Sequence, residues 1–160
     1  RLQFLAAALS ALLLAPCAGG LKALLGVADA ELRYRSRHAR GLAPQPVAEL
    51  VMLDGDNPRA LRYQLDSLAE HVALLPDGAA LAEPLRARLA ALDALSLCDC
   101  FVRELLAHGR PAAGASHATA CEPLRQVLAD IWASGNQLAD ALAQRYFTHL
   151  DARSRATVSL

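Results

Sequence analysis

The residues best suited to chemistry lie in one stretch, residues 31–65, where arginines at the end of a predicted helix are followed by a short acidic loop. Guanidinium groups bind carboxylates and phosphates through paired hydrogen bonds, so this combination can form either internal ion pairs or a receptor for an anion. The candidate interaction or clasp residues are Tyr34, Arg35, Arg37, Asp54, Asp56, Asn57 and Arg59.

Two interpretations of this cluster remain open. In the first, the arginines pair with the acidic loop and hold two helices in register, which affects geometry more than net stability. In the second, the cluster contacts an anionic ligand or a partner protein, or serves an enzyme of unknown reaction that uses Arg35, Arg37, Asp54 and Asp56. Replacing Arg37 with alanine separates the two, because loss of folding indicates a clasp and loss of binding by a folded protein indicates recognition.

Other motifs that could carry chemistry give no site. The sequence has neither a glycine-rich phosphate loop nor a dinucleotide fingerprint, so we expect no cofactor. Cys98 and Cys100 lie two residues apart in a predicted helix, where side chains diverge by about 200° and cannot share one zinc ion. The residues around Cys17 and Cys121 are not those of a recognised nucleophilic cysteine. We therefore predict no catalytic residue and no metal ligand.

Composition restricts the fold and the partners. Apolar residues make up 54% of the 160 residues and aromatic residues 4%, and most of the apolar residues are leucine and alanine, which favour helix. Sixteen basic residues balance sixteen acidic ones, so no overall field attracts nucleic acid or an anionic membrane. These numbers predict a single all-α domain that binds neither.

Helical spacing of the apolar residues predicts a multi-helix bundle of about five long helices and one short helix, in mostly antiparallel order because the linkers are short. Asn57 as N-cap and Pro58 at the first position mark the start of one long helix. We expect residues 1–150 to form one domain and residues 151–160 to be a disordered tail. The predicted helices cover about residues 2–15, 21–40, 47–53, 58–75, 81–108 and 119–146.

The apolar N-terminal run has a second interpretation. Residues 2–17 resemble a signal sequence, which would make this a secreted or lipid-anchored helical protein. A single basic residue precedes the run, and Pro16 stands directly before Cys17. An interior bundle helix is the favoured interpretation, because leucine, phenylalanine and alanine on all sides suit a helix surrounded by others.

Residues 28–76 contain, in order, the pieces YRSRH at 34–38, LAPQPV at 42–47, LDGDNPR at 53–59, YQL at 63–65 and LAEH at 68–71. With these pieces the stretch resembles the bacterial alpha-E domain family. The likeness becomes looser from residue 81 to residue 147. The family's Glu-Arg signature lies in an earlier helix and is absent here, so the chain is similar to the C-terminal part of such a domain.

The resemblance implies an all-α domain of the bacterial cytoplasm, encoded beside or fused to circularly permuted ATP-grasp proteins and transglutaminase-like proteins. Such systems make or modify peptides, and their catalytic chemistry lies in those partners. On this basis we expect a non-catalytic, cytoplasmic helical domain that docks onto, or serves as a scaffold for, an ATP-grasp peptide ligase. We expect no nucleic acid and no membrane as partners.

Overall fold

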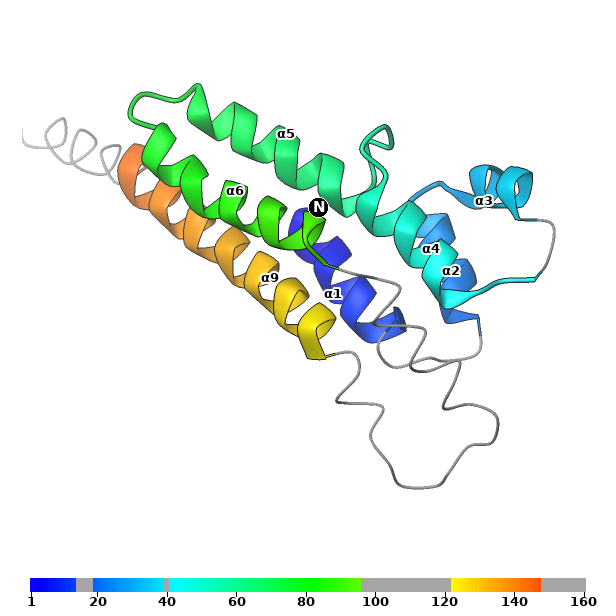
Figure 1. Cartoon of the computed structure of the whole chain (residues 1–160). Coiled ribbons are helices and arrows are strands. Elements are labelled where there is room, and N and C mark those ends of the chain that lie inside the picture. The colour runs from blue at the N-terminus through cyan, green and yellow to red at the C-terminus, as the bar shows by residue number, and fades with distance from the viewer. Residues whose placement is uncertain (14–18, 39–40, 96–121, 148–160) are drawn as a thin grey trace, which may run out of the picture.

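The computed structural model describes residues 1–13, 19–38, 41–95 and 122–147, and every regular element in these residues is helical (Figure 1). This confirms the predicted all-α fold. The predictions for Cys17, Cys98, Cys100, Cys121 and residues 151–160 concern positions outside the described residues. The elements are α1 (Leu2–Leu13), α2 (Gly20–Val27), α3 (Glu31–Arg37), α4 (Pro44–Ala48), the π-helical segment η1 (Glu49–Leu53), α5 (Leu61–Ala73), α6 (Ala79–Asp93), α9 (Glu122–Leu142) and the π-helical segment η2 (Ala143–Phe147).

Four helices form the main bundle. Helix α1 contacts α5 and α9, and α6 contacts the same two helices from the other side. Figure 1 shows α6 returning alongside α5 after the turn at residues 74–78. The centre is filled by fully buried side chains from all four helices, including Leu9, Leu65, Leu85, Leu128 and Ile131. Residues 2–13 of the N-terminal run thus form a helix that buries one face, including Leu5 and Leu9, in the core. None of the helices in the described residues is both long and apolar enough to cross a membrane.

A second group of helices, α2, α3, α4 and η1, lies at the end of the bundle away from the α5–α6 turn (Figure 1). Helix α2 contacts α1, α3, α4 and η1, and η1 also contacts α5. Its apolar centre continues the bundle core through the buried residues Leu24, Tyr34, Val47 and Met52. Three of the seven candidate interaction residues, Tyr34, Arg35 and Arg37, lie in α3 of this end group, and the other four lie in the loop between η1 and α5.

The single helix predicted over residues 21–40 is wrong, because the chain turns sharply between α2 and α3. Asp29 adopts the left-handed conformation, with φ of 51°. The Asp29 N–H donates to Gly26 O (3.1 Å) and the Ala30 N–H to Leu25 O (2.8 Å), which is the hydrogen-bond pattern of a Schellman motif. Aspartate tolerates this conformation better than most residues, so a glycine is not required.

The predicted helix start at Asn57 and Pro58 is also wrong. Helix α5 begins at Leu61, and its N-cap position is Ala60. Asn57 instead closes the preceding turn, where its side-chain Oδ1 accepts the Arg59 N–H at 2.9 Å and its carbonyl accepts the Ala60 N–H at 2.9 Å. An asparagine that stabilises a turn produces the same local sequence signal as one that caps a helix.

Two further boundaries differ from the predictions. The short helix begins at Pro44 rather than near Val47, because Pro44 occupies the first turn, where its missing N–H costs no hydrogen bond. Helix α6 ends at Asp93, whereas the apolar pattern predicted a helix continuing to residue 108. Residues 96–121, which contain the rest of that prediction and the predicted start of the last helix, lie outside the described residues.

Candidate functional site

The acidic loop is joined to α3 by an ion pair between Arg33 and Asp54. One carboxylate oxygen of Asp54, Oδ2, binds Nη1 of Arg33, and the other, Oδ1, accepts the N–H of Asp56 at 3.1 Å. The Asp54 side chain is only 11% exposed, whereas that of Arg33 is 37% exposed. A partly buried carboxylate with partners on both oxygens fixes the position of the loop relative to α3.

Two more links join the loop to the corner between α2 and α3. The buried side-chain amide of Asn57 donates to Ala28 O at 2.9 Å. The guanidinium of Arg59 lies 3.4 Å from a carboxylate oxygen of Asp29, and both side chains are more than half exposed. The Asn57 bond satisfies a buried carbonyl and is the stronger constraint, because exposed ion pairs contribute little. We call the Arg33–Asp54, Asn57–Ala28 and Arg59–Asp29 links together the junction.

Tyr34 attaches the segment that follows α3. Its side chain is 3% exposed, and its hydroxyl donates to Gly41 O at 3.2 Å and accepts the N–H of Ala43 at 3.0 Å. Its ring packs against His38 with 4.8 Å between the centroids. Tyr34 is therefore a positioning residue for the chain around residue 41.

The expected pairs of Arg35 and Arg37 with Asp54 and Asp56 are not formed. Arg35 lies near Glu31 of its own helix, at 3.8 Å, and Arg37 and the Asp56 carboxylate make no ion pair with a described residue. Helical geometry accounts for this. Arg35 points about 200° around the helix axis from Arg33, and Arg37 lies about one turn beyond Arg33 along the axis. Arg35, Arg37, Asp54 and Asp56 therefore make no ion pair with one another, and a role for them in a reaction or in contact with a partner stays a prediction.

Arg33 was missed as the partner of Asp54, although a signal for it existed. Asp54 follows the buried run Leu50–Met52 after one half-buried residue, Leu53, so it emerges at the edge of the core. Arg33 precedes the buried Tyr34 and emerges at a similar depth. Distance in sequence from this buried neighbour separates Arg33 from Arg37, but it does not separate Arg33 from Arg35, which also adjoins Tyr34.

A pocket of about 320 Å³ opens beside α2 and α3, next to the junction. It combines charged and apolar side chains, and sequence reasoning missed its α2 member, Lys22. Its lining residues are Lys22, Leu25, Glu31, Tyr34, Arg35, His38, Gly41 and Leu42.

A wider apolar groove of about 510 Å³ runs between α1 and α9. Four of its seven lining residues are alanine, and the one tryptophan of the chain, Trp132, also lines it with 49% of its surface exposed. No role for Trp132 was predicted from the sequence. The groove is lined by Ala6, Ala7, Ser10, Ala11, Leu128, Ala129 and Trp132.

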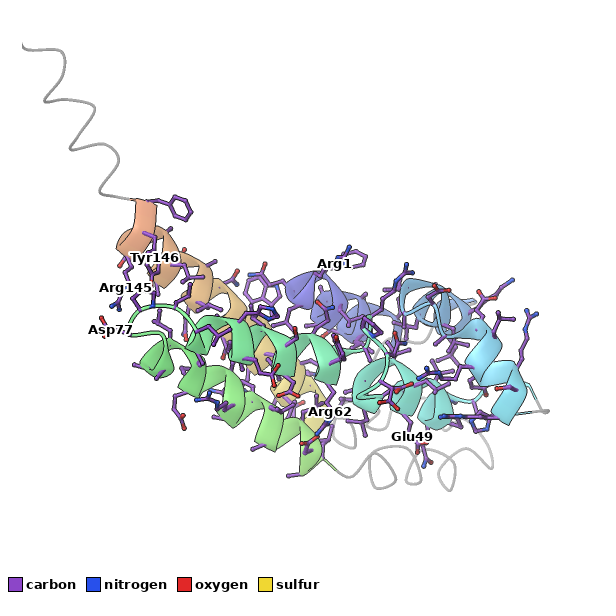
Figure 2. All side chains as sticks on the ribbon, turned by 90° about the horizontal axis from the view of Figure 1, so that it is seen from above. Arg1, Glu49, Arg62, Asp77, Arg145 and Tyr146 are labelled. Carbon is purple, nitrogen blue, oxygen red and sulfur yellow. The ribbon has the colours of Figure 1, made fainter. Side chains whose placement is uncertain are left out.

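Ion pairs between helices hold the bundle around these sites. Arg62 of α5 binds Asp93 of α6 through two hydrogen bonds, at 2.8 and 3.3 Å, and the hydrogen bond and charge of Asp93 raise the pKa of Arg62 above its ordinary value. At the other end, Arg145 binds Asp77 at 2.6 Å and the Tyr146 hydroxyl donates to Pro76 O at 3.1 Å (Figure 2). Within the described ranges, no three His, Cys, Asp or Glu side chains gather closely enough to hold a metal ion.

Comparison with known proteins gives one match. A family model, described as a predicted alpha-helical domain with a conserved ER motif, matches residues 1–147. The printed sequence contains no Glu-Arg dipeptide. Searches of curated proteins and of solved structures found no match.

Proposed function

The chain belongs to the Alpha-E family, and on that basis we propose that it is a non-catalytic helical domain that docks onto an ATP-grasp peptide ligase in the bacterial cytoplasm. The ligase, with a transglutaminase-like protein, performs the synthesis or modification of a peptide, and this domain supplies a binding surface. The observation that carries the proposal is Trp132, half exposed beside the apolar groove between α1 and α9.

The side chains of the groove suit a packed helix. Ala7, Ala11 and Ala129 are small and exposed, so a partner backbone can approach closely. The hydroxyl of Ser10 already donates a hydrogen bond to Ala6 O at 2.9 Å, so it needs no acceptor from the partner helix. Amphipathic helices bind in such apolar grooves, and tryptophan is enriched among the residues that dominate binding energy. The occupant we propose is an amphipathic helix of the ligase.

The junction supports a structural rather than a reactive role for the charged residues. The Asp54 carboxylate and the Arg33 guanidinium are engaged with each other, and Asn57 is engaged with backbone groups. These partners account for the Asp54 carboxylate, the Arg33 guanidinium and the Asn57 amide as links within the fold. They hold the end group of helices against the bundle that carries the groove.

Co-purification tests the proposal. The full chain is co-expressed with the ATP-grasp protein encoded beside it, and the complex is isolated through a tag on the ligase. We expect the wild-type domain to co-purify and the Ala129→Glu and Trp132→Ser variants to be lost, because each places a polar group in an apolar interface. Leu74→Ser is the matched control, since Leu74 is 84% exposed in the α5–α6 turn, away from the groove.

Retention of both groove variants at the wild-type level would contradict the docking site. Failure of the wild-type domain to co-purify would contradict the docking function itself. Circular dichroism of each variant confirms that it is folded. Sequencing the N-terminus of the mature protein tests the separate alternative that residues 2–17 are a signal.

A further inference from the structure

The pocket beside α2 and α3 gathers basic side chains that the fold leaves available. Lys22 is the one lysine of the chain, against fifteen arginines, and it makes neither a hydrogen bond nor an ion pair with any described residue. Arg35 is 72% exposed, and its closest ion-pair approach, to Glu31, is 3.8 Å. That distance is beyond a direct hydrogen bond, so the Arg35 guanidinium retains its donors.

The charge of the pocket indicates what it could bind. Among the described lining residues, Lys22 and Arg35 contribute two positive charges, Glu31 contributes one negative charge, and His38 lies at the end of α3 as a further potential donor. The described lysine, arginine and glutamate side chains therefore leave an excess of one positive charge. A pocket with that excess matches a singly charged anion, whereas a phosphate dianion would leave a negative charge uncompensated.

The apolar walls of the pocket favour a ligand with an apolar body. Leu25 and Tyr34 are 2% and 3% exposed and form firm surfaces, and Leu42, which is 46% exposed, covers one side. Tyr34 is itself held in place by its two hydroxyl hydrogen bonds. A volume of about 320 Å³ accommodates a small molecule or one residue at a chain end.

We propose that this pocket binds a carboxylate attached to an apolar group, with Lys22 and Arg35 on the carboxylate and Leu25, Tyr34 and Leu42 around the apolar group. The carboxylate belongs either to a small free acid or to the C-terminus of a peptide, which present the same chemistry. The site is separate from the α1–α9 groove, and its test does not require the ligase.

The single lysine provides the readout. We measure the rate at which trinitrobenzenesulfonate modifies Lys22 in the full chain, by mass spectrometry of the peptide that contains it, with increasing N-acetyl-leucine. We expect N-acetyl-leucine to slow the modification to saturation, and N-acetyl-leucinamide, which lacks only the carboxylate, to have no effect. Acetyl-Ala-Ala-Ala-Leu distinguishes the sources, because tighter binding of this peptide indicates a chain terminus and tighter binding of N-acetyl-leucine indicates a free acid.

Two arginine variants complete the test. Arg35→Gln should weaken protection by N-acetyl-leucine about tenfold, the effect expected for loss of one charged hydrogen bond. Arg86→Gln is the control, because Arg86 has the same kind of helical pair, with Glu83 at 3.9 Å, but lies on α6. Any one of four results would overturn the proposal. N-acetyl-leucine and its amide could protect Lys22 equally, or inorganic phosphate could protect it as well as N-acetyl-leucine does. No probe could protect it, or Arg35→Gln could be protected as well as the wild type.

Discussion

At the scale of single residues, Asp54 and Arg33 carry the charged part of the junction. Asp54→Ala removes the ion pair and the acceptor of the Asp56 N–H, and leaves the Arg33 guanidinium unpaired at a partly buried site. We expect the free energy of unfolding, from urea denaturation, to fall by about 1–3 kcal/mol. Arg37→Ala is the matched control and should change it by less than about 0.5 kcal/mol, because Arg37 is exposed.

This pair of variants also decides between the two interpretations of the charged stretch. A large loss of stability in Asp54→Ala with no loss in Arg37→Ala agrees with a clasp made by Arg33. Equal losses in both variants would mean that Arg37 contributes to the junction in solution, against the arrangement described here.

Asn57 is the buried member of the junction, and its replacement should cost more than that of an exposed ion pair. Asn57→Ala leaves the carbonyl of Ala28 without its donor and the N–H of Arg59 without its acceptor. We expect a loss of about 2–3 kcal/mol in urea denaturation, the cost of buried polar groups left without partners. Arg59→Ala removes only the exposed pair with Asp29, so a loss as large as that of Asn57→Ala would contradict this ranking.

At the scale of elements, the turn between α5 and α6 depends on a glycine for reasons of space rather than backbone conformation. A Cβ at Gly78 would lie 1.9 Å from Val72 O and 2.9 Å from Leu75 O, so the turn would have to open. We expect Gly78→Ala to lower the free energy of unfolding by about 2 kcal/mol or more. At Gly41 no atom lies within 4 Å of such a Cβ, so Gly41→Ala should be nearly neutral. Equal unfolding midpoints for the two variants would argue against the packed turn.

The helices of the bundle were predictable because their apolar residues recur at helical spacing. Leu61, Leu65 and Val72 of α5 are buried as the pattern predicted. The break at Asp29 was not predictable in this way, since it is made by backbone hydrogen bonds that the apolar pattern does not record. A left-handed aspartate carries a weaker sequence signal than the usual glycine.

The location of the junction was predictable, but its pairs were not. Charge pattern alone brought the arginine-rich helix and the acidic loop together as candidates. The choice of Arg33 depends on where α3 begins, which follows from the unpredicted turn at Asp29. The role of Asn57 depends on Ala28 O, a partner distant in sequence, so no local rule assigns it.

At the scale of the whole molecule, the chain is a helical bundle with a second group of helices fixed to one end. Two of its recesses differ in character, because the α1–α9 groove is apolar, whereas the pocket beside α2 and α3 is charged. The junction links α3 and the α2–α3 corner to the loop that leads into α5. This arrangement allows a partner helix and a small carboxylate to bind at separate places.

The measurement that tests the docking function most directly uses the single tryptophan. With 5-fluorotryptophan incorporated, the chain gives one fluorine resonance, from Trp132, and the unlabelled ATP-grasp protein proposed as its partner is added in steps. We expect the chemical shift of Trp132 to change as ligase is added and the change to reach its limit at one ligase per domain. The reason is that the bound partner helix covers the half-exposed ring. An unchanged resonance in a sample where gel filtration shows the complex would contradict docking at the groove, and no complex at all would contradict the proposed function.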